Sequence, residues 1–266
     1  MGILNVTPDS FSDGGVHFDP AIAIAHARAM ADQGAAMLDV GGESTRPGAP
    51  AVEIKDEIAR TAPVIAAIRS EIATPISIDT RKAPVARAAH EAGADLINDV
   101  AGLTFDPELA PYAASSGLPV CIMHAQGTPE TMQRDPRYDN VVLDVYDWLA
   151  ARIDALESTG IPGTMIMTDP GIGFGKTQAH NLALLQNLSL FHGLGCPILL
   201  GASRKRFIGD LSQTPVAADR VPGSLAVAIC GVAQGVQMLR VHDVTETRAA
   251  LQLWQAATYG ALTAPE

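Results

Sequence analysis

Three polar side chains, Asp79, Asn98 and Asp169, each follow directly on a short apolar run of the sequence. Carboxylate and amide groups that meet in one pocket suit a ligand rich in N–H donors, because each buried donor then finds an acceptor. A pterin or guanine ring, with its guanidine-like edge, is such a ligand. A helix cap or a strand-end turn would explain any one of these residues alone, but the three together favour a binding site.

Basic residues follow the last two apolar runs. One run leads into Ser203-Arg204-Lys205-Arg206, and the other leads into Arg240-Val241-His242. Arg240 and His242 alternate along an extended segment, so both side chains point to one side of it. Together with Asn5, at the end of the first apolar run, they would form a clamp for a diphosphate group.

Two further features do not predict the chemistry that they first suggest. The glycine-rich run 171–177 is not a nucleotide-binding P-loop, because Pro170 stands where that motif needs its first glycine. It instead allows a flat ligand to approach the backbone beside Phe174. His124 ends the fifth apolar run, and we interpret it as structural because no second histidine offers a metal pair. No Ser-His-Asp or Cys-His triad can be assembled from the strand ends.

Eight apolar runs of strand length must position these groups, and segments with helix-like spacing of apolar residues separate them. The runs are 2–6, 37–40, 76–78, 96–97, 120–123, 165–167, 198–200 and 237–241. The gaps between them are long enough for crossover helices, which predicts a parallel sheet. Asp243 and Glu246 have the spacing of a capping box and predict the start of the last helix.

A doubly wound open sheet and a closed barrel both accommodate such a chain. The count of eight runs, the length of 266 residues and the absence of a Pro/Gly-rich linker favour a single TIM (β/α)8 barrel over residues 1–266. In such a barrel the loops after the strands carry function, and those after strands 7 and 8 often bind phosphate. This agrees with the positions of the basic residues.

The net charge of −11 argues against a nucleic-acid or anionic-membrane partner. Within the expected strand-end loops basic and acidic residues nearly balance, and the acidic excess lies in the rest of the chain. The net charge therefore does not exclude an anionic substrate. The chain starts without a signal-peptide pattern, and its most apolar stretch, 225–233, is half the length of a membrane span. We therefore expect a cytoplasmic protein, with three cysteines that remain reduced.

The longer motifs of this sequence resemble those of the bacterial dihydropteroate synthases, in the same order from end to end. The matching segments are 2–15, 42–48, 169–176, 203–205 and 240–243. The resemblance implies a TIM-barrel transferase of folate biosynthesis that requires Mg²⁺. Such enzymes join (7,8-dihydropterin-6-yl)methyl diphosphate to 4-aminobenzoate, and they release 7,8-dihydropteroate and diphosphate. It further implies a homodimer, and because the loop motifs keep the ordinary pattern we expect a sulfonamide target.

The resemblance also assigns residues to three subsites. The pterin would be held by Asp79, Asn98, Asp169 and Lys205, in a pocket lined by Met123, Phe174 and Gly201. The diphosphate would bind Asn5, Arg240 and His242, with Val241 counted among the substrate-binding residues and Asn5 reaching Mg²⁺. The aminobenzoate site would comprise Phe11, Thr45, Arg46, Pro47 and Ser203.

This assignment implies a mechanism in which the diphosphate leaves ahead of the attack. Asp79 and Asp169 would stabilise a cationic pterin methylene, while Arg240, His242 and Mg²⁺ stabilise the departing charge. The catalytic residues would thus be Asp79, Asp169, Lys205 and Arg240. Two alternatives remain: a pterin-dependent methyltransferase barrel, and a non-catalytic pterin-binding paralogue. The aminobenzoate and diphosphate motifs argue against the first, and the intact Lys205 and Arg46 argue against the second.

Overall fold

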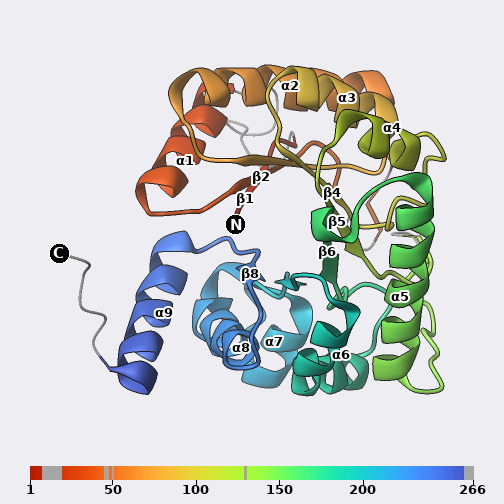
Figure 1. Cartoon of the computed structure of the whole chain (residues 1–266). Coiled ribbons are helices and arrows are strands. Elements are labelled where there is room, and N and C mark those ends of the chain that lie inside the picture. Colours follow the sequence, from red (N-terminus) through yellow and green to blue (C-terminus); the bar gives the residue numbers. More distant parts are fainter. Residues whose placement is uncertain (8–19, 45–47, 50, 129–130, 261–266) are drawn as a thin grey trace.

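Eight short strands alternate with helices in the computed structural model, which describes residues 1–7, 20–44, 48–49, 51–128 and 131–260 (Figure 1). The strands are β1 (Gly2–Asn5), β2 (Leu38–Gly41), β3 (Ile76–Asp79), β4 (Leu96–Asp99), β5 (Val120–Met123), β6 (Ile166–Asp169), β7 (Leu199–Leu200) and β8 (Met238–Leu239). Each overlaps one of the apolar runs that predicted it. The order is that of an α/β TIM barrel, so the predicted fold class is confirmed.

The helices lie outside the strands, as Figure 1 shows. They are α1 (Pro20–Asp32), α2 (Ile54–Glu71), α3 (Ala83–Glu91), α4 (Leu109–Ser116), α5 (Val141–Thr159), α6 (Gln178–Gln186), α7 (Arg206–Ser212), α8 (Val221–Ala233) and α9 (Val244–Tyr259). The expected capping box of α9 is wrong. The Asp243 carboxylate makes no cap hydrogen bond, because the Arg204 guanidinium binds it instead.

The strands pair in parallel, but not as one continuous ladder. Strands β1 to β6 form one sheet in chain order, and β7 and β8 form a second sheet. Single parallel bridges, Gly2 with Val241 and Thr168 with Ile198, link the two sheets at their two seams. At the second seam Pro197 accepts a hydrogen bond from Thr168 N–H at 2.9 Å, but it has no N–H to donate. The short β7 and β8 and this proline explain why the ladder is interrupted.

Two apolar clusters support the barrel. The larger cluster packs the helices against the outer faces of the strands and is mostly aliphatic. The smaller one, here called the methionine floor, consists of Met1, Leu96, Cys121 and Leu199 together with Met37, Met167 and Met238. Leu96 lies two residues before Asn98 on the same face of β4. The methionine floor therefore lies directly beneath the polar residues that end the strands.

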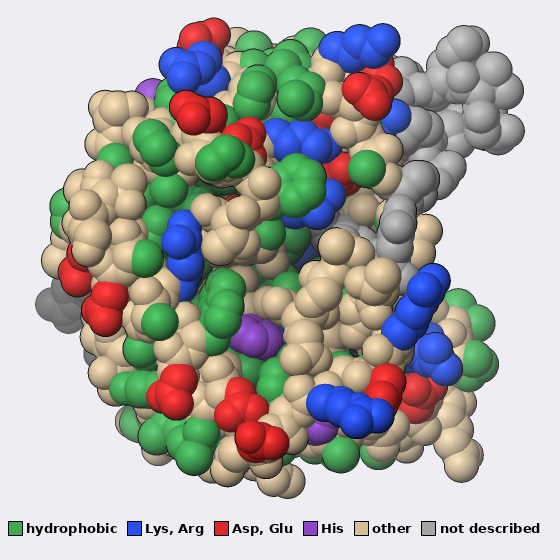
Figure 2. All heavy atoms as spheres, turned by 90° about the vertical axis from the view of Figure 1, so that its right-hand side faces the viewer, with side chains coloured by type: hydrophobic (Ala, Val, Ile, Leu, Met, Phe, Trp, Pro, Cys, Tyr) green, Lys and Arg blue, Asp and Glu red, His purple; other side chains and the backbone are tan. Residues whose placement is uncertain are grey.

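The surface gives no sign of a nucleic-acid footprint on the face shown in Figure 2. Lys and Arg side chains are interspersed there with Asp and Glu, and no extended basic patch forms. Among the described helices, none is both long and apolar enough on its own to cross a membrane. One bent pair, Arg206–Ser212 with Ala217–Ala233, meets the length and composition test when the two parts are taken together.

Candidate active site

The sheet register places a row of functional positions at the carboxyl ends of the first four strands. Asn5 is in register with Gly41, Gly41 with Asp79, and Asp79 with Asn98. Residues in register on parallel strands point to the same face, so these four positions face one space. Asp169 ends β6 in the same way, beside Met123 of β5. The predicted convergence of Asp79, Asn98 and Asp169 at strand ends is therefore present in the backbone.

A guanidinium joins two carboxylates at the centre of this end of the barrel. Arg240 Nε donates to Asp39 Oδ2 at 2.6 Å, and Arg240 Nη2 donates to Asp79 Oδ2 at 2.8 Å. Asn98 Nδ2 lies 3.3 Å from both oxygens of Asp39. The cluster thus links β2, β3, β4 and the end of β8 through charge-assisted hydrogen bonds.

Burial sets the electrostatics of the cluster. It raises the pKa of Asp79 above the ordinary 3.8, although Arg240 opposes this shift. Burial also raises the pKa of Asp169, against the effect of Lys205. For Arg240 burial alone would lower the pKa, but the carboxylates of Asp39 and Asp79 raise it. A carboxylate that burial makes costly to ionise gains from a ligand N–H, so both aspartates are suited to bind a ring with donors on its edge.

Lys205 and Phe174 form one wall of the site. Lys205 Nζ lies 4.5 Å from the centroid of the Phe174 ring and donates to Ile172 O. Burial lowers the pKa of Lys205 to about 8, and the charge of Asp169 opposes that shift. Gly173 adopts a φ of +82°, and a Cβ at this position would lie 3.1 Å from Lys205 Cδ. The glycine-rich loop therefore brings its backbone against the lysine stem, and the predicted approach of a flat ligand to this loop stays a prediction.

Two glycines lie against the buried carboxylates. A Cβ at Gly201 would lie 3.5 Å from Asp169 Oδ2 and 3.9 Å from Arg240 Cβ, while one at Gly41 would lie 3.4 Å from Asp79 Cβ. Neither glycine has a positive φ, so backbone conformation does not require glycine here. Because neither residue has a side chain, the backbone approaches these carboxylates directly, which would let a flat ring lie close to both.

His242, the second basic residue of the predicted diphosphate clamp, pairs with Ser203. Ser203 Oγ lies 3.0 Å from His242 Nδ1 and accepts from His242 N–H at 3.2 Å. Val241, between Arg240 and His242, is buried in the outer core, and its carbonyl oxygen accepts a backbone hydrogen bond from β1. The structure therefore brings His242 to Ser203, while Arg240 turns to Asp39 and Asp79. Phe11, Thr45, Arg46 and Pro47 lie outside the described residues.

A buried lysine and histidine support the Phe174 wall from behind. Lys176 Nζ donates to Phe174 O at 3.0 Å and lies 3.0 Å from His124 Nδ1. His124 packs edge-on against Trp148, with ring centroids 5.1 Å apart. Burial, and next the charge of Lys176, lower the pKa of His124 to about 3. A neutral, enclosed imidazole agrees with the structural role predicted for His124.

Lys176 gives a prediction for stability against pH. Burial lowers its pKa from 10.5 to about 7, so between these values the unfolded chain holds a proton that the folded chain does not. Stability should therefore rise with pH above 7, by at most about 1.4 kcal/mol per pH unit from this group. Urea unfolding between pH 7 and 9 measures the slope, which we expect to be smaller in Lys176→Met. The exposed-site variant Lys55→Met is the control, and an unchanged slope in Lys176→Met would contradict the prediction.

Sequence reasoning missed Asp39. It lies fully buried inside β2, between the apolar Leu38 and Val40, and it binds both Arg240 and Asn98. A carboxylate in the middle of an apolar strand is the signal that would have found it, because an ionised group is rarely buried without a partner.

The comparisons with known proteins agree with this geometry. A model of the family described as pterin binding enzyme matches residues 1–242. The dihydropteroate synthase of Escherichia coli (strain K12) is 46% identical over 256 residues, which cover 96% of this chain and 90% of that protein. The structure of Xanthomonas albilineans dihydropteroate synthase with 4-aminobenzoic acid has a TM-score of 0.92 at 46% identity, covering 97% of this chain and 92% of that one. The Yersinia pestis dihydropteroate synthase with a sulfonamide drug has a TM-score of 0.90 at 44% identity, covering 96% and 92%.

Proposed function

The chain belongs to the pterin-binding enzyme family, and we propose how its site carries out the reaction that its relatives share. That reaction is the transfer catalysed by a dihydropteroate synthase in folate biosynthesis. It condenses (7,8-dihydropterin-6-yl)methyl diphosphate with 4-aminobenzoate and yields 7,8-dihydropteroate and diphosphate. The observation that carries our assignment of the site is the buried carboxylate cluster, against which Gly41 and Gly201 place no side chain.

The pterin ring binds at this cluster. Asp79 and Asp169 accept N–H groups of the ring, and the Asn98 amide completes the edge that they recognise. Phe174 and the Lys205 stem cover one face of the ring, and Met123 beside Asp169 adds a polarizable contact. The raised pKa values of Asp79 and Asp169 support this placement, because ligand donors compensate the cost of two buried carboxylates.

Transfer proceeds by departure of the diphosphate ahead of attack. Asp79 and Asp169 stabilise the positive charge that develops on the pterin methylene, and Arg240 and His242 stabilise the departing oxygens. Arg240 is suited to both tasks because it already contacts Asp79 and belongs to the segment that carries His242. The amine of 4-aminobenzoate then adds to the methylene and loses its proton to water. The reaction needs no nucleophilic side chain.

Mg²⁺ is proposed as a partner of the diphosphate rather than as a resident ion. Within the described ranges, no group of three His, Cys, Asp or Glu side chains could hold a metal. The Asn5 amide oxygen at the end of β1 is a hard oxygen ligand, and Mg²⁺ commonly combines one or two protein ligands with phosphate oxygens and water. The donor set thus fits an Mg²⁺ held by Asn5 and the substrate, where the ion would neutralise leaving-group charge.

The 4-aminobenzoate is proposed to bind beside Ser203, together with the motif residues Phe11, Thr45, Arg46 and Pro47. The E. coli relative and the 4-aminobenzoic acid complex from X. albilineans support this assignment through their likeness to the chain. A sulfonamide would compete for the same place, and turnover that millimolar sulfonamide leaves unchanged would contradict it. A cytoplasmic location stays a prediction.

A homodimer is proposed through α6, α7 and α8. The buried residues of α8 are the small Ser224, Ala228 and Gly231, so its larger apolar side chains remain partly exposed. One of them, Val227, borders a groove of about 520 Å³. Its apolar lining includes Leu182, Leu185, Phe207, Ile208, Leu211 and Val227. Such a surface favours burial against a second copy. A monomer in sedimentation velocity at assay concentrations would contradict this proposal.

Release of diphosphate tests the proposed function. We expect the wild-type protein to release diphosphate from the pterin substrate only when 4-aminobenzoate and Mg²⁺ are both present. Lys205→Ala should lose turnover while circular dichroism and thermal unfolding stay close to wild type. Tight pterin binding without any 4-aminobenzoate-dependent release would instead identify a non-catalytic binding protein, and normal turnover in Lys205→Ala would remove that lysine from the catalytic set.

A further inference from the structure

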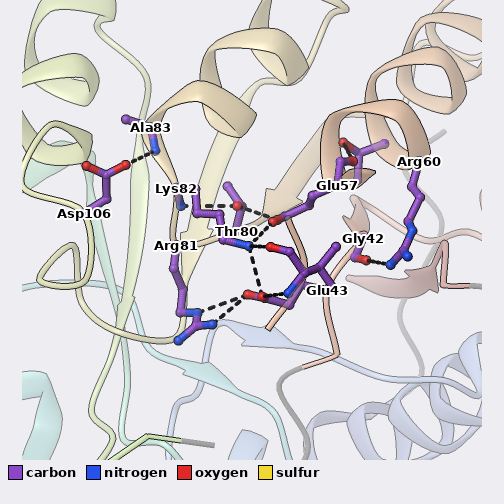
Figure 3. A network of polar contacts seen from close by, with 11 residues as sticks. Gly42, Glu43, Glu57, Arg60, Thr80, Arg81, Lys82, Ala83 and Asp106 are labelled. Carbon is purple, nitrogen blue, oxygen red and sulfur yellow. Dashed lines mark hydrogen bonds and ion pairs between the residues drawn. The ribbon is translucent and has the colours of Figure 1, made fainter. Parts of the chain in front are cut away.

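Four charged side chains are buried together behind the carboxyl ends of β2 and β3 (Figure 3). Lys82 Nζ lies 3.0 Å from Glu43 Oε1 and 2.6 Å from Glu57 Oε2. The fourth member, Arg81, donates to Glu43 Oε2 at 2.8 Å. We call Glu43, Glu57, Arg81 and Lys82 the buried ion cluster. It holds two negative and two positive groups and is therefore neutral as a whole.

The buried ion cluster ties together the two ends of segment 43–52. Glu43 Oε1 accepts the Val52 N–H at 2.9 Å, and Lys82 Nζ donates to Val52 O at 2.7 Å. One carboxylate and one ammonium thus hold both the first and the last residue of the segment. Thr45, Arg46 and Pro47 lie between those ends and outside the described residues.

The same cluster anchors the turn that follows Asp79. Thr80, Arg81 and Lys82 come directly after that aspartate, and Thr80 Oγ1 donates to Glu57 Oε1 at 2.7 Å. Figure 3 shows these side chains pointing toward one another from α2, from the end of β3 and from the segment after β2. Glu43 and Val52, the two ends of segment 43–52, are therefore held in a fixed relation to the strand end that carries Asp79.

Stability alone does not explain such a cluster. Buried ion pairs contribute little net stability compared with apolar groups of the same volume, because desolvation offsets their attraction. They do fix geometry, since each charged group requires its partners at hydrogen-bond distance. Burial would raise the pKa of Glu43, but its hydrogen bonds from Val52, Arg81 and Lys82 hold that pKa below 4.5. Glu43 is thus a fixed acceptor for three donors.

We propose that Glu43, Glu57 and Lys82 are positioning residues for the second substrate: they hold both ends of segment 43–52 in a fixed relation to Asp79. They do not touch either substrate. The proposal rests on the proposed function, which assigns 4-aminobenzoate to this segment and the pterin to Asp79. It predicts that loosening the buried ion cluster weakens use of 4-aminobenzoate far more than binding of the pterin.

The test separates the two substrates. In Lys82→Met we expect the KM for 4-aminobenzoate to rise by about tenfold or more, because small misplacements of a binding segment are costly. The dissociation constant of pterin diphosphate, measured by calorimetry without 4-aminobenzoate, should change by less than about twofold. Lys82→Arg keeps the positive charge, so its KM for 4-aminobenzoate should return most of the way to the wild-type value.

A second variant avoids an unpaired buried charge. Glu57→Gln combined with Lys82→Met removes one charge of each sign and leaves the Glu43–Arg81 pair, so the folded protein can be assayed. Its KM for 4-aminobenzoate should rise as in Lys82→Met. Arg69→Gln is the matched control, because it removes an ion pair with Asp95 at the other end of α2. Its KM should equal that of the wild type.

Two results would overturn the inference. One is an unchanged KM for 4-aminobenzoate in the folded double variant, and the other is an equal loss of affinity for both substrates, which a general structural role would give. A wild-type protein without 4-aminobenzoate-dependent turnover would instead overturn the proposed function. The two failures are therefore distinguishable.

Discussion

Replacement of Gly201 by valine is expected to abolish pterin binding and leave the barrel folded. The Cβ would stand 3.5 Å from Asp169 Oδ2, and the two methyl groups beyond it would fill the space above that carboxylate. The backbone allows a side chain because φ at Gly201 is not positive. We expect affinity for the pterin diphosphate, measured by calorimetry, to fall by at least about a hundredfold, since a ring that no longer fits loses both stacking and hydrogen bonds.

Gly201→Ala provides the graded control. Its single Cβ makes ordinary contacts, the nearest at 3.5 Å, so we expect a modest loss of affinity and a melting temperature close to that of the wild type. Wild-type pterin affinity in a folded Gly201→Val protein would show that the ring does not lie above Asp169.

Removal of the Arg240 guanidinium is expected to have the second large effect. In Arg240→Met the carboxylates of Asp39 and Asp79 lose their shared counter-charge, and the departing diphosphate loses a charge-assisted donor. We expect kcat/KM to fall by about a thousandfold, equivalent to about 4 kcal/mol. Affinity for pterin diphosphate should fall more than affinity for the pterin alcohol that lacks the diphosphate.

The pH profile checks the same variant. Arg240 lowers the pKa of Asp79 against the effect of burial, so its loss raises that pKa further. The carboxylate then forms only at higher pH, and the acidic limb of the activity profile should move upward. Arg152→Met, which removes an arginine that binds Gly102 O and Leu103 O, controls for loss of a partly buried cation. Equal losses of affinity for the diphosphate and the alcohol would disprove the diphosphate contact.

The ends of β3, β4 and β6 were predictable from the sequence because each of these strands is a short, largely apolar run that polar residues terminate. Asp79, Asn98 and Asp169 follow this rule, and the structure has them as the last or next-to-last residue of β3, β4 and β6. Asp39 breaks the rule because it lies among apolar neighbours inside its strand. Its counter-charge, Arg240, is 201 positions away in the sequence, so no local pattern reveals the pair.

Pairings between distant segments were less predictable. The alternation of Arg240 and His242 indicated a common direction, but Arg240 contacts Asp39 and Asp79 while His242 contacts Ser203. The choice depends on which carboxylates the other strands bring near Arg240, and the spacing of residues along one strand does not contain that information. The capping box of α9 failed for the same reason, because Arg204 from another loop takes the Asp243 carboxylate.

The buried ion cluster was not predicted either, because it also depends on contacts between segments that are distant in the sequence. Glu43, Glu57 and Lys82 come from three separate elements, and each one alone is typical of a solvated surface residue. Only their common burial reveals that they act together.

The methionine floor has a consequence for how this sequence can vary over evolutionary time. Its members touch one another through flexible thioethers and aliphatic groups, which tolerate exchange among Met, Leu and Ile at similar volume. The layer above it is fixed by charge and hydrogen bonds, so Asp39, Asp79 and Arg240 change only together. Volume-conserving exchanges should therefore accumulate in the methionine floor beneath the site, while the reacting layer stays constant.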